Sequence, residues 1–303
     1  MKDYERLKML EYPQGRIDIV IDTDAATEVD DPFAIAYALL SPERLSIRAV
    51  YAAPFAMNDR TSDPAEGMEM SYKEIKNIFR LCGKNSEHIY RGCYRFGLNQ
   101  SSPASEHLAR LANTYSSQRP LYVLALGASS NIANAILRYP DIREKIVIVW
   151  LAGNDFDDTP NVYNIYEDPE SARLIFDSGV PLVHVPCEPV TSHLLTNIPE
   201  LEHCIGKRNP LCNYLTKIVK EFTEEPFAWS KPLWDVGAAA YLIDQNYTLC
   251  ETTTAPIITS DLKWSRDYKR HLIKNVKKVR RDEIFRDLFT KLGSAPDRFC
   301  KDA

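Results

Sequence analysis

The chain carries four aspartates within ten residues, directly after an apolar segment. The segment Ile17–Ile21 is followed by Asp22 and Asp24, and then, after a short loop, by Asp30 and Asp31. The apolar run predicts a buried strand, and the apolar spacing after Asp31 predicts a helix. Carboxylates so close together repel one another, and a hard cation bound between them is the simplest compensation. In an open α/β sheet, ligands also bind at the carboxyl ends of strands.

Strand-like apolar segments alternate with helical patterns along much of the chain. This alternation predicts an α/β fold with one open, mostly parallel, Rossmann-like sheet and helices on both faces. No repeat, low-complexity tract or linker interrupts the pattern, so residues 1–303 are predicted to form a single domain. The strands are expected at Ile17–Ile21, Ser46–Ala52, Leu121–Leu126, Ile146–Leu151 and Leu182–Pro186. The helices are expected at 32–41, 66–82, 104–115, 130–138 and 168–178.

Three other segments are less regular. Residues 54–66 are polar and contain prolines, so we expect a loop there, over the site. Residues 190–234 are expected to be helical with irregular joins. Residues 270–292 carry many lysines and arginines before an amphipathic helix, and we expect them to form a solvated face.

Composition narrows the classes of partner. The formal net charge of −5 disfavours nucleic acid or an anionic membrane as the main partner. No stretch approaches the ~18 apolar residues of a membrane span, and the charged first residues lack the apolar core of a signal peptide. The seven cysteines are scattered and never spaced as CxxC, which favours reduced thiols in a cytoplasm. We therefore expect a cytoplasmic protein whose main partner is neither nucleic acid nor a membrane.

Two alternatives can be weighed on the aspartates alone. An EF-hand loop fails, because Thr27 stands where its turn glycine belongs and Phe33 where its bidentate glutamate belongs. A purely structural origin, with Asp30 as a helix cap and Asp22 at a strand end, accounts for only part of the set.

A haloacid-dehalogenase-type phosphatase is the alternative from another enzyme class. Its Asp-x-Asp after a strand supplies a nucleophile and an acid, and Gly153–Asp158 (GNDFDD) resembles its distal acidic motif. However, Ala26 stands where a Thr or Val is usual, and the Asp30-Asp31 pair has no role in that scheme.

The combination of a strand, Asp-x-Asp, a small loop, Asp-Asp and a helix resembles the signature of the nucleoside hydrolases, calcium-dependent N-ribohydrolases. The usual pattern D-x-D-P-G-x-D-D is here DTDAATEVDD, with a loop two residues longer and no Pro-Gly. Three more segments resemble the family in its order: Leu124–Ala133 (LALGASSNIA), Asn161–Glu170 (NVYNIYEDPE) and Lys231–Ala239 (KPLWDVGAA). The resemblance spans residues 17–240 and implies the nucleoside hydrolase fold, whose members are commonly dimers or tetramers.

The resemblance also implies a metal site. A calcium ion would be held by Asp24, Asp31, Asp235 and the backbone carbonyl of Leu126, with water and sugar hydroxyls completing its coordination. Asp24 would be the catalytic general base that takes a proton from the attacking water. Asp22 would support the other carboxylates from a second layer.

The same resemblance implies a substrate. Asp30 and Asn164 would bind the ribose hydroxyls of a nucleoside or another riboside. Trp234 replaces the histidine acid of the inosine-uridine branch and is similar to the purine-specific branch, where an indole stacks on the base. Val162 stands where the family has a glutamate for the ribose 5′ end, which leaves open a different riboside or modified nucleoside. The candidate leaving-group acids are His184, His193 and Tyr163.

Overall fold

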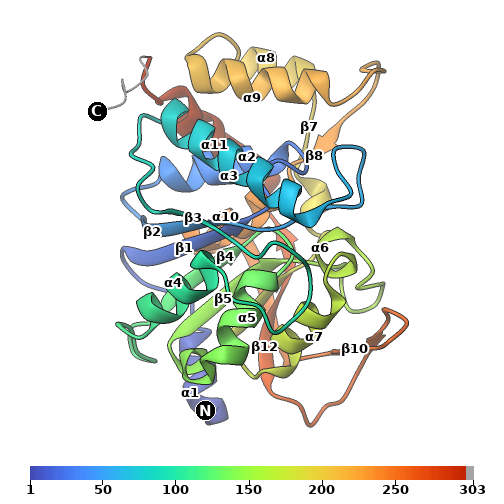
Figure 1. Cartoon of the computed structure of the whole chain (residues 1–303). Coiled ribbons are helices and arrows are strands. Elements are labelled where there is room, and N and C mark those ends of the chain that lie inside the picture. Colours follow the sequence, from blue (N-terminus) through green and yellow to red (C-terminus); the bar gives the residue numbers. More distant parts are fainter. Residues whose placement is uncertain (298–303) are drawn as a thin grey trace.

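A computed structural model describes residues 1–297 and centres on an eight-stranded sheet (Figure 1). The strand order is β3-β2-β1-β4-β5-β6-β12-β9. All neighbours pair in parallel except β12 and β9, which are antiparallel. The predicted open, mostly parallel sheet is thus confirmed. The strands are β1 Ile17–Thr23, β2 Leu45–Ala52, β3 Ile89–Arg91, β4 Leu121–Ala125, β5 Ile146–Leu151, β6 Leu182–Val185, β9 Thr248–Thr254 and β12 Leu272–Val279.

Helices cover both faces of this sheet, as predicted (Figure 1). One face carries α2 Asp30–Leu39, α3 Pro64–Leu81, α10 Trp234–Ile243 and α11 Arg281–Gly293, with α9 Pro210–Glu221 and α8 Ile198–Cys204 outside them. The other face carries α4 Pro103–Ala112, α5 Ser130–Arg138 and α7 Pro169–Asp177. The shorter elements include α1 Asp3–Met9, α6 Tyr163–Tyr166 and the β7–β8 pair, Leu195–Thr196 with Lys231–Pro232.

The strands are apolar at successive positions because both of their faces are buried. Ile19 and Ile21 of β1 belong to the core under α2 and α10, whereas Val20 belongs to the core under α4 and α5. In β5, Val149 and Ile148 divide between the two cores in the same way. Successive side chains of a strand point to opposite faces, so a continuous apolar run fills two cores at once.

The topology places the carboxyl end of β1 at a switch point. From β1 the chain adds β2 and β3 on one side, then adds β4, β5 and β6 on the other. In open α/β sheets a crevice forms where the order reverses, outside the carboxyl ends of the strands. Asp22 on β1 and Leu126 just after β4 lie at this position.

The prediction of an amphipathic helix at the end of residues 270–292 is confirmed, but the prediction of a solvated face before it is wrong. Residues Leu272–Val279 form β12, which lies inside the sheet between β6 and β9 and has Ile273, Asn275 and Val276 fully buried. α11 packs its apolar side into the core and leaves Asp282, Glu283 and Arg286 exposed. The lysines of β12 made this segment resemble a charged surface. One of its buried positions is also polar, because it is the amide side chain of Asn275.

The predicted secondary structure outside residues 270–292 is confirmed in outline. The ends of the five predicted strands lie within two residues of the observed ends, and Ile146–Leu151 matches at both ends. Residues 190–234 contain α8 and α9 with irregular joins. Within residues 1–297 the six cysteines are free, whereas Cys300 lies outside the described residues. Across that same range, no helix combines the length and the apolar character that crossing a membrane requires.

Candidate active site

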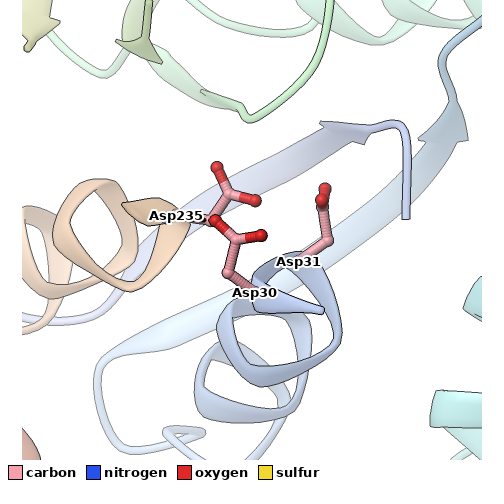
Figure 2. Close-up of side chains that lie close together, drawn as sticks. All are labelled: Asp30, Asp31 and Asp235. Atoms are coloured by element: carbon pink, nitrogen blue, oxygen red, sulfur yellow. Dashed lines mark hydrogen bonds between the residues drawn. The ribbon is translucent and has the colours of Figure 1, made fainter. Parts of the chain in front are cut away.

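Two helix starts converge at the carboxyl edge of the sheet. Asp30 and Asp31 form the first turn of α2, and Asp235 lies in the first turn of α10. The N-cap of α2 is Val29, so Asp30 is not a capping residue. The two helices pack side by side, and Figure 2 shows the three carboxylates projecting into the same space. The unpaired N–H groups of a helix start favour negative charge there.

These three carboxylates could hold a metal ion. Asp30, Asp31 and Asp235 are buried, and each offers an oxygen within 4.8 Å of the others. The Thr23 hydroxyl donates to Asp31, and the backbone N–H of Asp235 donates to Asp30 at 3.3 Å. Within the described residues, Oδ1 of Asp235 is buried and has no hydrogen-bond partner. An unpartnered buried oxygen beside converging carboxylates matches the oxygen ligands that a hard cation prefers.

Burial makes these carboxyls hold their protons strongly. It raises the pKa of Asp30 to about 6 and that of Asp24 to about 7. Burial, together with repulsion from the neighbouring aspartates, raises the pKa of Asp31 and Asp235 well above the usual value. A bound cation would favour the charged forms and release these protons. We call Asp24, Asp30, Asp31 and Asp235 the acidic cluster.

Asp24 lines the cavity, whereas Asp22 does not. Oδ2 of Asp24 accepts a hydrogen bond from the Thr27 hydroxyl at 2.8 Å. A Cβ at Gly127 would lie 2.6 Å from Oδ1 of Asp24, so the close approach requires glycine there. Asp22 is buried behind the cavity, where the Asn131 amide donates to it at 3.3 Å. Burial raises the pKa of Asp22 to about 8.

The acidic cluster opens into a cavity of about 350 Å³. Of the site residues predicted from sequence, these line it: Asp24, Asp30, Asp31, Leu126, Asn164, Trp234 and Asp235. Sequence reasoning missed Glu28, Asn154, Cys187 and Glu188, which also line it. The one available signal was for Glu28, because it lies in the loop that is longer than the family pattern.

Another part of the cavity wall is built on α6. The Asn164 amide donates to the carbonyls of Leu126 and Leu151, which ties α6 to the ends of β4 and β5. Beside it, Val162 and Tyr163 line the cavity. The Tyr163 hydroxyl donates to the carbonyl of Ala56, so part of the loop at 54–66 lies against this wall.

Two candidate acids lie away from the cavity. His184 is fully buried, and its ring nitrogens contact the Asn275 side chain and the Ala152 carbonyl. His193 is exposed. Of the three candidates, Tyr163 lines the cavity, and its hydroxyl already donates to a backbone carbonyl.

The acidic motif proposed for a phosphatase also lies elsewhere. Asp155 accepts hydrogen bonds from Asn275 and Lys277 of β12, whereas Asp157 and Asp158 are exposed. The segment therefore contributes Asn154, and none of its carboxylates, to the cavity. We call Asp155, His184, Asn275 and Lys277 the Asp155 network.

Known structures share this fold. A plant nucleoside hydrolase superposes with a TM-score of 0.73 at 19% identity, covering 92% of this chain and 99% of that one. A purine-preferring ribonucleoside hydrolase from Gardnerella vaginalis gives a TM-score of 0.72 at 19% identity, covering 92% of this chain and 98% of its own.

Sequence comparison gives the same family. A pyrimidine-specific ribonucleoside hydrolase of Citrobacter koseri is 25% identical over 252 residues, which are 71% of this chain and 76% of that relative. A probable ribonucleoside hydrolase of Dictyostelium discoideum is 28% identical over 167 residues, about half of each chain (51% and 49%). The model of the inosine-uridine preferring nucleoside hydrolase family matches residues 19–285. The chain therefore belongs to this family of ribonucleoside-hydrolysing enzymes.

Proposed function

We propose that the protein hydrolyses the N-glycosidic bond of ribonucleosides in a calcium-dependent reaction, releasing ribose and free base, and that it favours purines. The observation that carries the proposal is the acidic cluster, whose buried carboxylates open into one cavity together with Trp234 and Asn164. Those residues supply ligands for a hard cation, acceptors for sugar hydroxyls and an aromatic surface for a base.

The proposed calcium ligands are Asp24, Asp31, Asp235 and the Leu126 carbonyl. Carboxylate oxygens of Asp30, Asp31 and Asp235 lie within 4.8 Å of one another. Asp30 would therefore add to the negative charge around the ion as well as bind a sugar hydroxyl. When bound, the ion would lower the pKa of a water molecule and orient it towards the anomeric carbon. The unpartnered Oδ1 of Asp235 supports this assignment, because an ion would satisfy it.

The protein's own groups would then act on the water and the sugar. Asp24, held by the Thr27 hydroxyl, would accept the proton of the attacking water. Asp30 and Asn164 would hold the ribose hydroxyls and so fix the sugar for attack. Asp22 would hold its place behind Asp24 through Asn131.

The preference for purines rests on Trp234. Its indole lines the cavity at the start of α10, next to Asp235. Stacking on an aromatic ring is worth about 1–3 kcal/mol per base, and the larger purine ring gains more from it. The relatives differ on this point, since one is pyrimidine-specific and another purine-preferring.

The test is ribose release from inosine, adenosine, guanosine, uridine and cytidine, with calcium and after chelation. We expect release that chelation abolishes and calcium restores, faster from purines than from pyrimidines. Asp24→Asn should lower kcat by about 10²–10⁴-fold, the usual contribution of a general base. Trp234→Ala should lower purine turnover by about tenfold to a hundredfold.

Glu87→Gln is the matched control. This exposed carboxylate lies just before β3, at the amino ends of the strands, whereas the cavity lies at their carboxyl ends. The substitution should leave both rates unchanged. Equal release from pyrimidines would contradict the purine preference and leave the metal assignment standing. Magnesium-dependent phosphate release from a phosphomonoester, without ribose release, would overturn the proposal in favour of the phosphatase.

A different riboside or modified nucleoside is the second candidate. Val162 is the observation that favours it, since this apolar residue lines the cavity where the family pattern has a glutamate. We further propose a cytoplasmic homo-oligomer, a dimer or tetramer, and the mass of the purified protein in light scattering tests the assembly.

A further inference from the structure

An ion pair lies at the edge of the cavity outside the acidic cluster. Glu28 is in the loop between Asp24 and Asp30, and Lys231 is in β8, three residues before Trp234. The two are 203 residues apart in sequence and are joined through Lys231 Nζ and Glu28 Oε2. The lysine side chain is only 8% exposed, whereas that of the glutamate is 41% exposed. The lysine therefore holds the carboxylate from inside the protein.

This pair lies on the Trp234 side of the cavity. Nζ of Lys231 is 5.9 Å from the centre of the Trp234 ring and 5.1 Å from that of Phe222. Glu28 and Trp234 both line the cavity, and Lys231 is bonded to the first and lies over the ring of the second. A base stacked on Trp234 would therefore share the cavity with the Glu28 carboxylate.

Glu28 still has free acceptor capacity. A carboxylate accepts about four hydrogen bonds over its two oxygens, and the lysine is joined to Oε2. The described residues place no second donor on this side chain, so Oε1 is available to a ligand. An ionised carboxylate attracts N–H groups and repels carbonyl oxygens and ring-nitrogen lone pairs.

We propose that Glu28 is a specificity-determining residue that selects bases with adjacent N–H donors, the edge presented by a 2-amino-6-oxopurine. This inference rests on the proposed nucleoside hydrolysis. Guanosine offers a ring N–H and an amino group side by side, and inosine offers the ring N–H alone. Adenosine presents a ring nitrogen that would face the carboxylate with a lone pair. The expected order is guanosine, then inosine, then adenosine.

The test compares kcat/KM for these three nucleosides in the unmodified enzyme, Glu28→Gln and Glu87→Gln. Hydrogen bonds to a charged group are stronger than those to a neutral group, so Glu28→Gln should lower kcat/KM for guanosine by about tenfold to a hundredfold. Inosine should fall less, and adenosine should not fall. Glu87→Gln, far from the cavity, should keep the original order.

Lys231→Met gives a second, independent comparison. It leaves the Glu28 carboxylate in the chain but removes the group that positions it, so guanosine should lose most of its advantage over inosine. If instead both variants lower all three values by one common factor, Glu28 only braces its loop and the inference is overturned.

If the proposed nucleoside hydrolysis itself is wrong, the experiment gives a different result. In that case the unmodified enzyme releases no ribose from any nucleoside. Equilibrium binding of free guanine and hypoxanthine, measured by calorimetry, then still tests Glu28. A guanine preference that Glu28→Gln removes supports the inference, and equal affinities for the two bases contradict it.

Discussion

Two buried polar clusters lie near the same edge of the sheet, and they differ in how far the protein satisfies them. In the Asp155 network, the Asp155 carboxylate accepts hydrogen bonds from Asn275 at 2.8 Å, from the Phe156 N–H at 2.9 Å and from Lys277. Burial alone would raise the pKa of Asp155, but the bonds from Lys277 and Asn275 hold it below its usual value.

The acidic cluster is the opposite case. Its carboxylates have few donors, Oδ1 of Asp235 has none among the described residues, and the pKa values are raised. The same type of side chain therefore binds its proton weakly in one cluster and strongly in the other. A complete network stabilises the fold, whereas an incomplete one marks the place where a ligand belongs.

The largest expected effect is on calcium affinity, which should depend on the acidic cluster and not on the Asp155 network. Asp235→Asn removes a charge from the acidic cluster and should weaken calcium binding by more than about a hundredfold, as measured by calorimetry. Without metal, the same variant should melt at a higher temperature, because one source of repulsion is gone. A lower melting temperature in chelator, with unchanged calcium affinity, would show that Asp235 is a structural residue.

The second effect breaks the complete network. Lys277→Met leaves Asp155 without its cation and should cost about 1.5–3 kcal/mol of unfolding free energy, the range for hydrogen bonds to charged groups. Urea denaturation measures this loss. Calcium affinity should stay within a factor of a few, because Lys277 does not line the cavity. A large loss of calcium affinity would mean that the two clusters are coupled.

The third effect is a pH dependence of the metal-free protein. Carboxyls whose folded pKa is raised bind more protons in the folded state, so their stabilising contribution is full below the usual pKa of 3.8 and is lost as pH rises through the folded values. For Asp30, Asp24 and Asp22 those folded pKa values are about 6, 7 and 8. A tenfold difference in proton affinity between the folded and unfolded states corresponds to about 1.4 kcal/mol.

The melting temperature in chelator should therefore fall between about pH 4 and pH 8, and saturating calcium should flatten that fall. Asp155 has a lowered pKa, so its contribution runs in the other direction, being present above about pH 4 and lost in acid. A metal-free protein whose melting temperature rises steadily from pH 5 to pH 8 would contradict the assignment of the acidic cluster.

Local patterns were enough for much of the fold and site. The apolar run into Asp22 and Asp24 predicted the central strand, and the spacing after Asp31 predicted α2, because both elements are specified by neighbouring residues. The resemblance added Asn164 and Trp234, which line the cavity with the aspartates.

The parts that sequence reasoning missed depend on distant partners. Glu28 acquires its role only when Lys231 lies beside it, and 203 residues separate them. From sequence alone, β12 resembles a charged surface. In the fold, Lys277 is bonded to Asp155 and Asn275 to His184, and both partners are distant in sequence. Neither pairing leaves a periodic signal in the chain, so pattern analysis has nothing to detect.

The convergence of α2 with α10 has a consequence for the order in which the protein is made. Asp30 and Asp31 leave the ribosome early, but Asp235 follows them by about two hundred residues. Contacts of such separation close late, because the chain between them must be ordered first. An unfinished chain thus has Asp30 and Asp31 but not Asp235. The proposed calcium ion would bind tightly only once the sheet between these helices is assembled, and its binding would then report finished folding.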